Sequence, residues 1–127
     1  MAPKEVINSP AAPEPIGPYS QAIRSNGTLY ISGQIAIDQS TGMLITDNIE
    51  EETHQVMRNL NAILGEAGLT FSDIVKCSIF IKDMDQFSAI NEVYATYFSE
   101  NPPARETVEV VRLPKDVNVE ISAIATS

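Results

Sequence analysis

Hydrophobic and polar positions along the chain follow two different periods, and the first of them predicts a β-hairpin over 19–37. The alternation there has a period of two, and the dipeptide Asn26-Gly27, which favours a type I′ turn, separates two β-rich runs. A glycine within the second run, Gly33, indicates a bulge or the close approach of another molecule. The residues of this run that we expect on one face are Leu29, Ile31, Ile35 and Ile37, with Gly33 among them.

From Asp47 the period becomes helical, which predicts a helix that ends near Gly68. Three consecutive acidic residues, Glu50–Glu52, complement the positive N-terminus of such a helix. The expected apolar stripe comprises Val56, Leu60, Ile63, Leu64 and Ala67. A short edge strand is expected just before this helix, at 43–45.

The second half of the chain repeats the change from strand to helix. Residues 73–83 are typical of a buried strand, and a helix is expected to begin near Asp85 and to end before the prolines at 102–103. Two final strands are expected over 107–113 and 117–125. The inward side chains of the second helix are expected to be Phe87, Ile90, Tyr94, Tyr97 and Phe98.

This order of elements predicts a two-layer α/β sandwich, with a mixed six-stranded sheet and two helices on one of its faces. Residues 1–127 are expected to form a single domain, with residues 1–15 as an extended N-terminal arm. No helix remains to cover the other face of the sheet, although that face is not very polar. We therefore expect self-association, for which cyclic homo-oligomers are the usual solution.

Composition and charge narrow the function. The net charge is −9, with 17 acidic and 8 basic residues, and the absence of a basic cluster disfavours nucleic-acid binding. The single cysteine, Cys77, excludes an internal disulfide and fits a reducing compartment. No apolar run reaches the ~20 residues that span a bilayer, and the N-terminus lacks the apolar core of a signal peptide. These features predict a cytoplasmic protein.

Two charged residues near the C-terminus are candidates for chemistry. Glu120 lies mid-strand and out of phase with the apolar positions. It is either a solvated carboxylate or a carboxylate in a cleft between subunits, where partial burial would raise its pKa toward the range of a general acid or base. Arg105 follows a rigid turn, and its guanidinium suits the bidentate recognition of a carboxylate. The alternative for Arg105 is a surface salt bridge, for example to Glu106.

Four other polar or reactive residues have structural as well as functional interpretations. Asn91 lies on the apolar stripe of the second helix and needs a hydrogen-bond partner, and Tyr19 can either pack or cover a ligand. His54, the only histidine, is expected to be solvated, and Cys77 is expected in the core. No metal-ligand cluster, P-loop or dinucleotide-binding glycine motif is present, which favours cofactor-free chemistry or simple binding.

Several segments, taken together, resemble one known family. They are "IGPYSQAI", "LYISGQIAID", "NLNAILGEAG", "DIVKCSIFIKDMDQFSAINEVYATYF" and "PPARETVEVVRLPKDVNVEISAIA". In register over residues 16–125, they resemble the RidA family, also called the YjgF/YER057c/UK114 family. The resemblance implies a chorismate-mutase-like fold and a homotrimer with sites in the clefts between subunits.

The resemblance also implies an activity: hydrolysis of reactive enamines and imines such as 2-aminoacrylate to 2-keto acids and ammonia, without a metal or an organic cofactor. The corresponding enzyme is a 2-iminobutanoate/2-iminopropanoate deaminase, which protects the cell from damaging metabolites. In this interpretation Arg105 binds the substrate carboxylate, Glu120 positions or activates water, and Gly33 offers its backbone to the substrate. The remaining residues that resemble pocket residues are Tyr19, Ser32, Phe87, Asn91 and Thr107.

Thr107 departs from the family pattern, because many members have cysteine there. The resemblance implies a mainly backbone contact at this position, so threonine is expected to be tolerated, but thiol chemistry is excluded there.

Two other functions stay open from the sequence. One is a trimer that binds small molecules and regulates a partner without turnover, since a fold does not determine a function. The other is a ribonuclease or translation inhibitor, a role attributed to some family members. The charge of −9 counts against the second.

Overall fold

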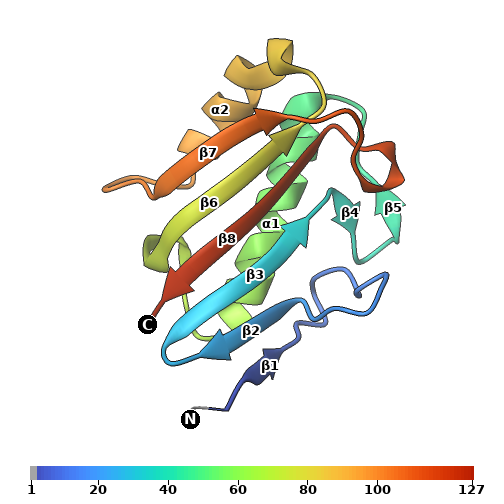
Figure 1. The fold of residues 1–127 in the computed structure, drawn as a ribbon. Coiled ribbons are helices and arrows are strands. Elements are labelled where there is room, and N and C mark those ends of the chain that lie inside the picture. The colour runs from blue at the N-terminus through green and yellow to red at the C-terminus, as the bar shows by residue number, and fades with distance from the viewer. Residues whose placement is uncertain (1–2) are drawn as a thin grey trace.

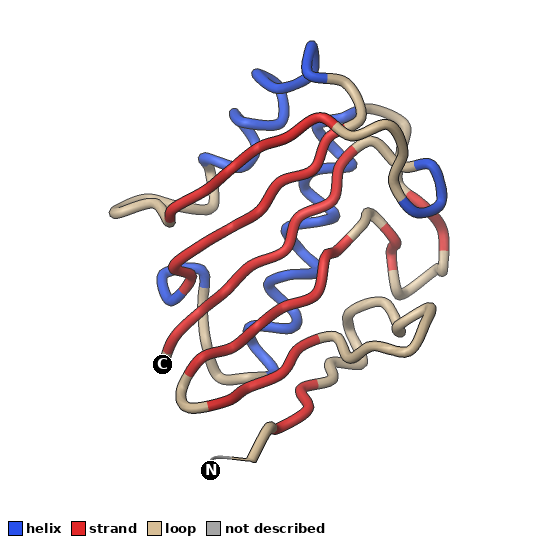
Figure 2. Tube along the Cα trace, viewed as in Figure 1, coloured by secondary structure: helices blue, strands red, loops and turns tan. Residues whose placement is uncertain are grey.

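Six strands of the computed structural model, which describes residues 3–127, form one mixed sheet, and both α-helices pack on the same face of it (Figure 1). The strands lie in the order β1-β2-β3-β8-β6-β7; β6 and β7 are parallel, and all other neighbours are antiparallel. The predicted two-layer α/β sandwich is confirmed, as the colouring by secondary structure also shows (Figure 2). The elements are β1 (Glu5–Ile7), β2 (Ala22–Ser25), β3 (Thr28–Gln34), β4 (Ile37–Asp38), β5 (Met43–Leu44), α1 (Ile49–Glu66), β6 (Ile74–Ile81), α2 (Phe87–Ala95), β7 (Ala104–Glu109) and β8 (Val119–Thr126).

The predicted hairpin is present, but the sixth strand of the sheet is not the expected one. Asn26 and Gly27 have φ values of 52° and 77°, the two positive values that a type I′ turn requires. The strand expected at 43–45 forms a separate two-stranded sheet with β4. The sixth strand is β1, which pairs with β2 at the sheet edge and lies in the expected arm. Residues 1 and 2 of that arm lie outside the described residues.

A bulge in β3 reverses the alternation of its side chains. Between two pairings with β8, the β3 chain advances three residues, from Ile31 to Gln34, while β8 advances two. Gln34 therefore takes a buried position on the core side. The expectation that Ile35 shares the face of Ile31 is wrong for this reason: Ile35 instead packs in a second apolar cluster with Leu113 and Val117.

The core lies between the sheet and α1. The Asn48 side chain accepts a hydrogen bond from the Glu51 backbone N–H at 2.8 Å and caps the start of α1, and Gly68, with φ of 76°, follows its end. Each fully buried Leu or Ile side chain contributes about 1.5–3 kcal/mol to folding. The expected stripe is confirmed, with Val56, Leu60, Ile63, Leu64 and Ala67 all buried. Among the described helices, none has the length and apolar character needed to span a bilayer.

The second helix is shorter than expected and β7 is shifted. A 3₁₀ turn occupies 84–86, so α2 begins at Phe87 rather than near Asp85, and it ends at Ala95, well before the prolines. Tyr97 and Phe98 therefore follow the helix but still pack against the core. β7 begins at Ala104 rather than at 107, because its parallel pairing with β6 starts there.

Candidate active site

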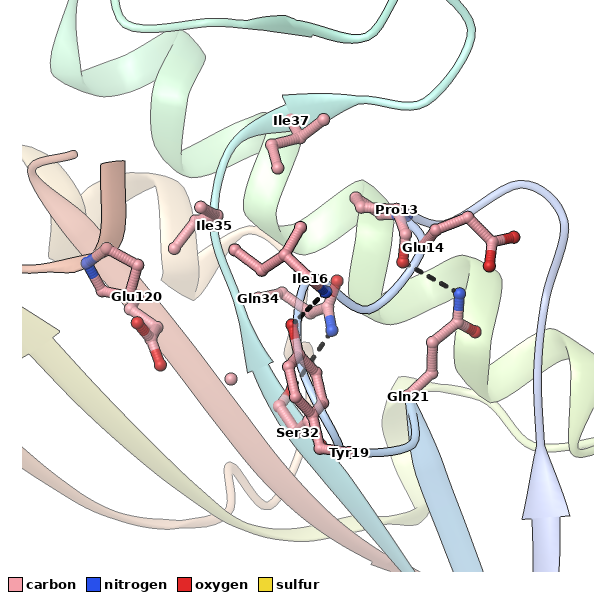
Figure 3. A pocket seen from close by; sticks show the side chains of 12 residues that line it. Pro13, Glu14, Ile16, Tyr19, Gln21, Ser32, Gln34, Ile35, Ile37 and Glu120 are labelled. Atoms are coloured by element: carbon pink, nitrogen blue, oxygen red, sulfur yellow. Dashed lines mark hydrogen bonds between the residues drawn. The ribbon is translucent and has the colours of Figure 1, made fainter. Parts of the chain in front are cut away.

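Glu120 lies at a cavity of about 340 Å³ beside the bulge of β3 (Figure 3). Its side chain is on the sheet face that carries no helix, half-buried, and desolvation raises the pKa of its carboxyl above the ordinary value. No hydrogen bond among residues 3–127 involves this carboxyl group. The sequence left open a solvated carboxylate or a carboxylate in a cleft between subunits. The half-buried position at a cavity rules out a fully solvated group, and the cleft between subunits stays a prediction.

Gly33 makes room for this carboxylate. A Cβ atom at Gly33 would lie 2.8 Å from the Cδ atom of Glu120, which is closer than real Cβ contacts. The close approach that the strand glycine predicted is therefore an approach by a side chain of the same chain. We use the name glutamate half-site for Tyr19, Ser32, Gly33 and Glu120.

Two hydroxyl groups of the glutamate half-site are tied to the backbone around them. The Ser32 hydroxyl donates to the Ser20 carbonyl at 2.7 Å, and the Tyr19 hydroxyl accepts from the Ile16 backbone N–H at 3.3 Å. Tyr19 therefore fixes the backbone at Ile16, just after the N-terminal arm, and also lines the cavity (Figure 3).

Buried polar side chains of α1 hold the segments on either side of this cavity. Glu52 is 0% exposed and accepts hydrogen bonds from both the backbone N–H and the side-chain amide of Asn118, each at 2.7 Å. Asn59 donates to the carbonyls of Ile35 and Ile37 at 2.9 and 3.0 Å. The expectation that Glu52 mainly complements the helix N-terminus is therefore incomplete, because it also fixes the start of β8.

Sequence reasoning missed both of these residues. Asn59 carries a detectable signal, since it falls among the apolar positions of α1, where a polar side chain needs a partner. Glu52 has no such signal, because its partner is 66 residues away.

Arg105 lies elsewhere, on β7 beside α2. Its Nη1 donates to the Asn91 side-chain oxygen at 2.7 Å, and its guanidinium carbon is 5.0 Å from the ring centre of Tyr94 and 5.6 Å from that of Phe87. With the nearby Thr107 these residues form what we call the arginine half-site. Burial raises the pKa of Tyr94.

The salt bridge considered between Arg105 and Glu106 is absent among the described residues. Glu106 points to the other sheet face, where its carboxylate pairs with Lys76 at 3.0 Å and accepts a hydrogen bond from Ser78. The arginine half-site also contains two buried polar atoms without a hydrogen-bond partner within residues 3–127, the hydroxyls of Tyr94 and Thr107.

The two half-sites are on opposite faces of the sheet in one chain. Across β6, Arg105 and Ala123 both pair with Cys77, and Cys77 and Ala123 are core residues, so Arg105 points to the helix side. Glu120 alternates with Ile121, which is buried in the core, so it points to the uncovered side. One chain therefore does not bring Arg105 and Glu120 together.

The remaining candidates are structural. Cys77 is fully buried, as expected, and burial raises its pKa. His54 is only partly exposed rather than fully solvated, and its Nδ1 is hydrogen-bonded to the Tyr97 hydroxyl at 2.7 Å. Residues 3–127 contain no group of three or more His, Cys, Asp or Glu side chains placed to hold a metal ion.

One family model and several known proteins are similar to this chain over nearly its whole length. A family model described as Endoribonuclease L-PSP matches residues 9–127. A RutC family protein of Pyrococcus horikoshii is 53% identical, with 96% of this chain and 97% of that protein covered. A 2-iminobutanoate/2-iminopropanoate deaminase of Mus musculus is 44% identical, with 96% of this chain and 90% of that protein covered.

Solved structures agree with the fold. A Rid-family protein of Yersinia pestis has a TM-score of 0.96 and 50% identity, covering 98% of this chain and 100% of that one. The Escherichia coli protein TdcF, solved with bound serine, has a TM-score of 0.93 and 39% identity, covering 97% of both chains.

Proposed function

Since this chain belongs to the endoribonuclease L-PSP family, which includes its RutC and Rid relatives, we propose that it is a deaminase that hydrolyses 2-imino acids and their enamine tautomers, such as 2-aminoacrylate. The name of the mouse relative, at 44% identity, supports this choice of reaction. The activity removes reactive metabolites and protects the cell. A cytoplasmic location, which the single buried cysteine favours, is part of the proposal.

The reaction requires proton transfer and no change of oxidation state. Water adds to C2 of the imine R–C(=NH)–COO⁻, the resulting amino alcohol loses ammonia, and R–CO–COO⁻ remains. Glu120 takes a proton from the attacking water and returns one to the departing nitrogen. The raised pKa of its carboxyl brings it closer to the pH at which one group serves as both base and acid.

Arg105 binds the carboxylate that every 2-imino acid carries. One N–H group of the Arg105 guanidinium donates to Asn91, and the rings of Phe87 and Tyr94 hold the guanidinium in place. The other N–H groups of the guanidinium stay available for a ligand. TdcF, which was solved with bound serine, shows that a relative of this fold accepts an amino acid.

A complete site in this proposal needs two copies of the chain. The half-sites lie on opposite faces of one sheet, so the arginine half-site of one copy has to meet the glutamate half-site of the next. A ring of three copies, the homotrimer that the resemblance implied, does this by a heterologous interface. The uncovered sheet face supports it, because Tyr30 and Val108 there are 51% and 40% exposed.

The observation that carries the proposal is the half-buried Glu120 carboxyl at a cavity, with its pKa raised and without a hydrogen-bond donor among residues 3–127. The test uses an amino-acid oxidase with catalase to generate imines in place and semicarbazide to trap them. Wild-type protein should lower semicarbazone formation. Arg105→Ala should be about 100-fold less effective, as expected for the loss of the charge-assisted hydrogen bonds to the substrate carboxylate.

Two outcomes would contradict the proposal. If wild-type protein has no effect on the imines of several amino acids but binds a 2-keto acid saturably, the chain is a binding protein without turnover. If it instead cleaves RNA, and Arg105→Ala removes that cleavage through every purification step, the ribonuclease alternative replaces the deaminase. The net charge of −9 weakens that alternative.

A further inference from the structure

Glu120 carries the carboxylate that faces the cavity of the glutamate half-site. Of the residues that line this cavity within 3–127, Glu14 also has a carboxylate, but Figure 3 shows it turned away from the cavity. The lining includes no Asp, His, Cys, Lys or Arg in that part of the chain, and the oxygen of the Tyr19 hydroxyl already accepts a hydrogen bond from the Ile16 N–H. A ligand in the cavity therefore has one strong partner for proton transfer, the carboxyl group of Glu120.

The Glu120 carboxylate is fixed at one side of the cavity. Its neighbours in β8, Val119 and Ile121, are buried in the core and prevent the strand from turning. Gly33 leaves room for the carboxylate close to the backbone of β3, and Figure 3 shows Glu120 and Tyr19 at opposite sides of the cavity. A ligand between these two side chains meets the carboxylate from one direction only.

Little at this position weakens the carboxylate as a base. No hydrogen bond within residues 3–127 involves it, and burial raises the pKa of the Glu120 carboxyl. Pro114, Ile16 and Ile35, which also line the cavity, are apolar and their side chains donate no hydrogen bond. A carboxylate without donors around it can take up a proton from carbon as well as from water.

Enamine substrates need a proton transfer that the addition of water does not supply. An enamine becomes an imine only when its C3 atom gains a proton, and water can then add to C2. Because C3 is bonded directly to C2, a ligand that is held for the attack of water at C2 also brings C3 close to the same carboxylate.

We infer that this site has a further activity: it interconverts the enamine and imine tautomers of its ligands, and Glu120 moves the proton to and from C3. The activity is measured as the exchange of C3 hydrogens with solvent, and it requires a 2-imino acid with at least one hydrogen at C3. The inference rests on the proposed function, because it uses the same carboxylate and the same ligand orientation.

In the exchange step, the Glu120 carboxylate removes a proton from C3 of the protonated imine R–CH₂–C(=NH₂⁺)–COO⁻. The electron pair of the broken C3–H bond forms the double bond between C2 and C3, and the π electrons of the C=N bond return to nitrogen. The products are the enamine R–CH=C(NH₂)–COO⁻ and the protonated carboxyl of Glu120. The reverse step returns a proton to C3, so the oxidation state of the ligand does not change.

The experiment incubates wild-type protein with 2-oxobutanoate and ammonium in D₂O and follows the two C3 hydrogens by proton NMR. Reversal of the proposed hydrolysis supplies the imine from these two compounds. Because Glu120 approaches the ligand from one direction, the protein should replace one of the two C3 hydrogens much faster than the other. Exchange in free solution has no such preference, and omission of ammonium should remove the acceleration by the protein.

Two variants assign the proton transfer. Glu120→Gln should lower the protein-dependent exchange rate by about 10²-fold or more, the usual contribution of general acid–base catalysis. Since Glu120→Gln also impairs the formation of the imine, the preference for one hydrogen is the readout that places the transfer within the site. Glu14→Gln is the matched control, because it removes the carboxylate that faces away from the cavity, and it should keep the wild-type rate and preference.

The imine-trapping assay, run on the same protein, separates this inference from the proposed function. If wild-type protein hydrolyses imines but exchanges neither C3 hydrogen, or exchanges both at equal rates, the inference is overturned and the proposed function stands. An equal loss of exchange in Glu14→Gln and Glu120→Gln also overturns it, since the transfer is then not specific to Glu120. If the protein neither hydrolyses imines nor exchanges hydrogens at C3, the proposed function fails, and this inference with it.

Discussion

The arginine half-site and the glutamate half-site hold their charged groups in opposite ways. The guanidinium of Arg105 is exposed to water, stacked against two rings and hydrogen-bonded to Asn91. The carboxyl of Glu120 is half-buried and has no donor among residues 3–127. The difference teaches that binding and proton transfer need different surroundings: a cation that binds benefits from a fixed orientation, whereas donors around a carboxylate would lower its pKa and weaken it as a base.

The two half-sites are also supported by different means. Aromatic side chains of α2 support Arg105 on the outermost strand of the sheet. The glutamate half-site depends on buried hydrogen bonds between α1 and the ends of β3 and β8, through Asn59 and Glu52. A substitution in either half therefore tests one kind of support without direct damage to the other.

The largest expected effect comes from Gly33→Ala, which breaks the glutamate half-site. The added Cβ would lie within 3 Å of the Glu120 side chain, so the carboxylate has to move away. Because the displaced atoms belong to the end of a flexible side chain, the fold should survive. We expect the imine-trapping assay to show a loss of kcat of about 10²–10⁴-fold, the usual contribution of general acid–base catalysis.

Gly65→Ala is the control for this substitution. A Cβ atom at Gly65, within α1, meets nothing within 4 Å, and alanine is the better helix former. It should keep full activity and raise the melting temperature slightly. If Gly33→Ala also keeps full activity, the position of the Glu120 carboxylate does not determine turnover.

A mixing experiment tests whether Arg105 and Glu120 of one complete site come from two different chains. Arg105→Ala and Glu120→Gln are each expected to be nearly inactive. When the two are unfolded, mixed in equal amounts and refolded, an intact site forms wherever Arg105 of one chain meets Glu120 of another. With random assembly this is about one quarter of the sites, so about one quarter of wild-type activity should return.

Refolded wild-type protein sets the full activity in this experiment, and each variant refolded alone sets the background. If the mixture has only the mean activity of the two separate variants, then each site takes Arg105 and Glu120 from the same chain, and the two half-sites do not meet between copies.

The fold class could be predicted from the sequence because its signals are local. The Asn26-Gly27 turn and the periods of the flanking residues are read within a few positions. β1 was missed because three residues are too few to show a period and prolines surround it. The reversed side-chain direction after Gly33 was missed because only the pairing of β3 with β8 shows where the extra residue is accommodated.

The candidate site could be predicted only as a set of residues. Whether Arg105 and Glu120 share a sheet face depends on the strand order β8-β6-β7 and on the register of the parallel pairing between β6 and β7. These strands are separated in the sequence by α2, so no local pattern shows this register. The partners of Asn91 and Glu52 are likewise set by the packing of helices on the sheet, not by the neighbouring residues. The sequence therefore indicates the residue types, and the long-range register determines that they form two half-sites.

A smaller effect is expected from Asn91→Ala, which weakens the arginine half-site without removing its charge. The guanidinium keeps both rings but loses the 2.7 Å hydrogen bond that orients it. A lost hydrogen bond of ordinary strength corresponds to an increase in KM of about three- to tenfold. Because the proton-transferring group is untouched, kcat should hardly change.

Asn61→Ala is the matched control, since Asn61 is an exposed asparagine on α1 outside both half-sites. A fall of kcat in Asn91→Ala at unchanged KM would mean that Asn91 acts in the chemical step rather than in the orientation of Arg105.

The smallest effect concerns the dependence of stability on pH. The pKa of Glu120 is higher in the folded chain than the unfolded value of about 4.3, so its contribution to stability is fully present below that value and is lost as pH rises through the folded pKa. Glu120→Gln removes this loss. Relative to wild type, the variant should therefore gain stability between pH 4 and pH 7, by less than about 1 kcal/mol because the group is partly solvated.

Denaturant unfolding of both proteins at one fixed protein concentration measures this difference, since association also contributes to stability. Glu106→Gln is the informative comparison, because the hydrogen bond from Ser78 and the pairing with Lys76 lower the pKa of Glu106 in the folded chain. Its contribution is fully present above the unfolded pKa and is lost as pH falls through the folded pKa. Glu106→Gln should therefore be less stable than wild type by a nearly constant amount well above the unfolded value of about 4.3, and this difference should shrink as pH falls below that value. A difference between Glu120→Gln and wild type that does not change with pH would mean that the Glu120 carboxyl is solvated like any surface group, and the contrast between the two half-sites would then rest on Arg105 alone.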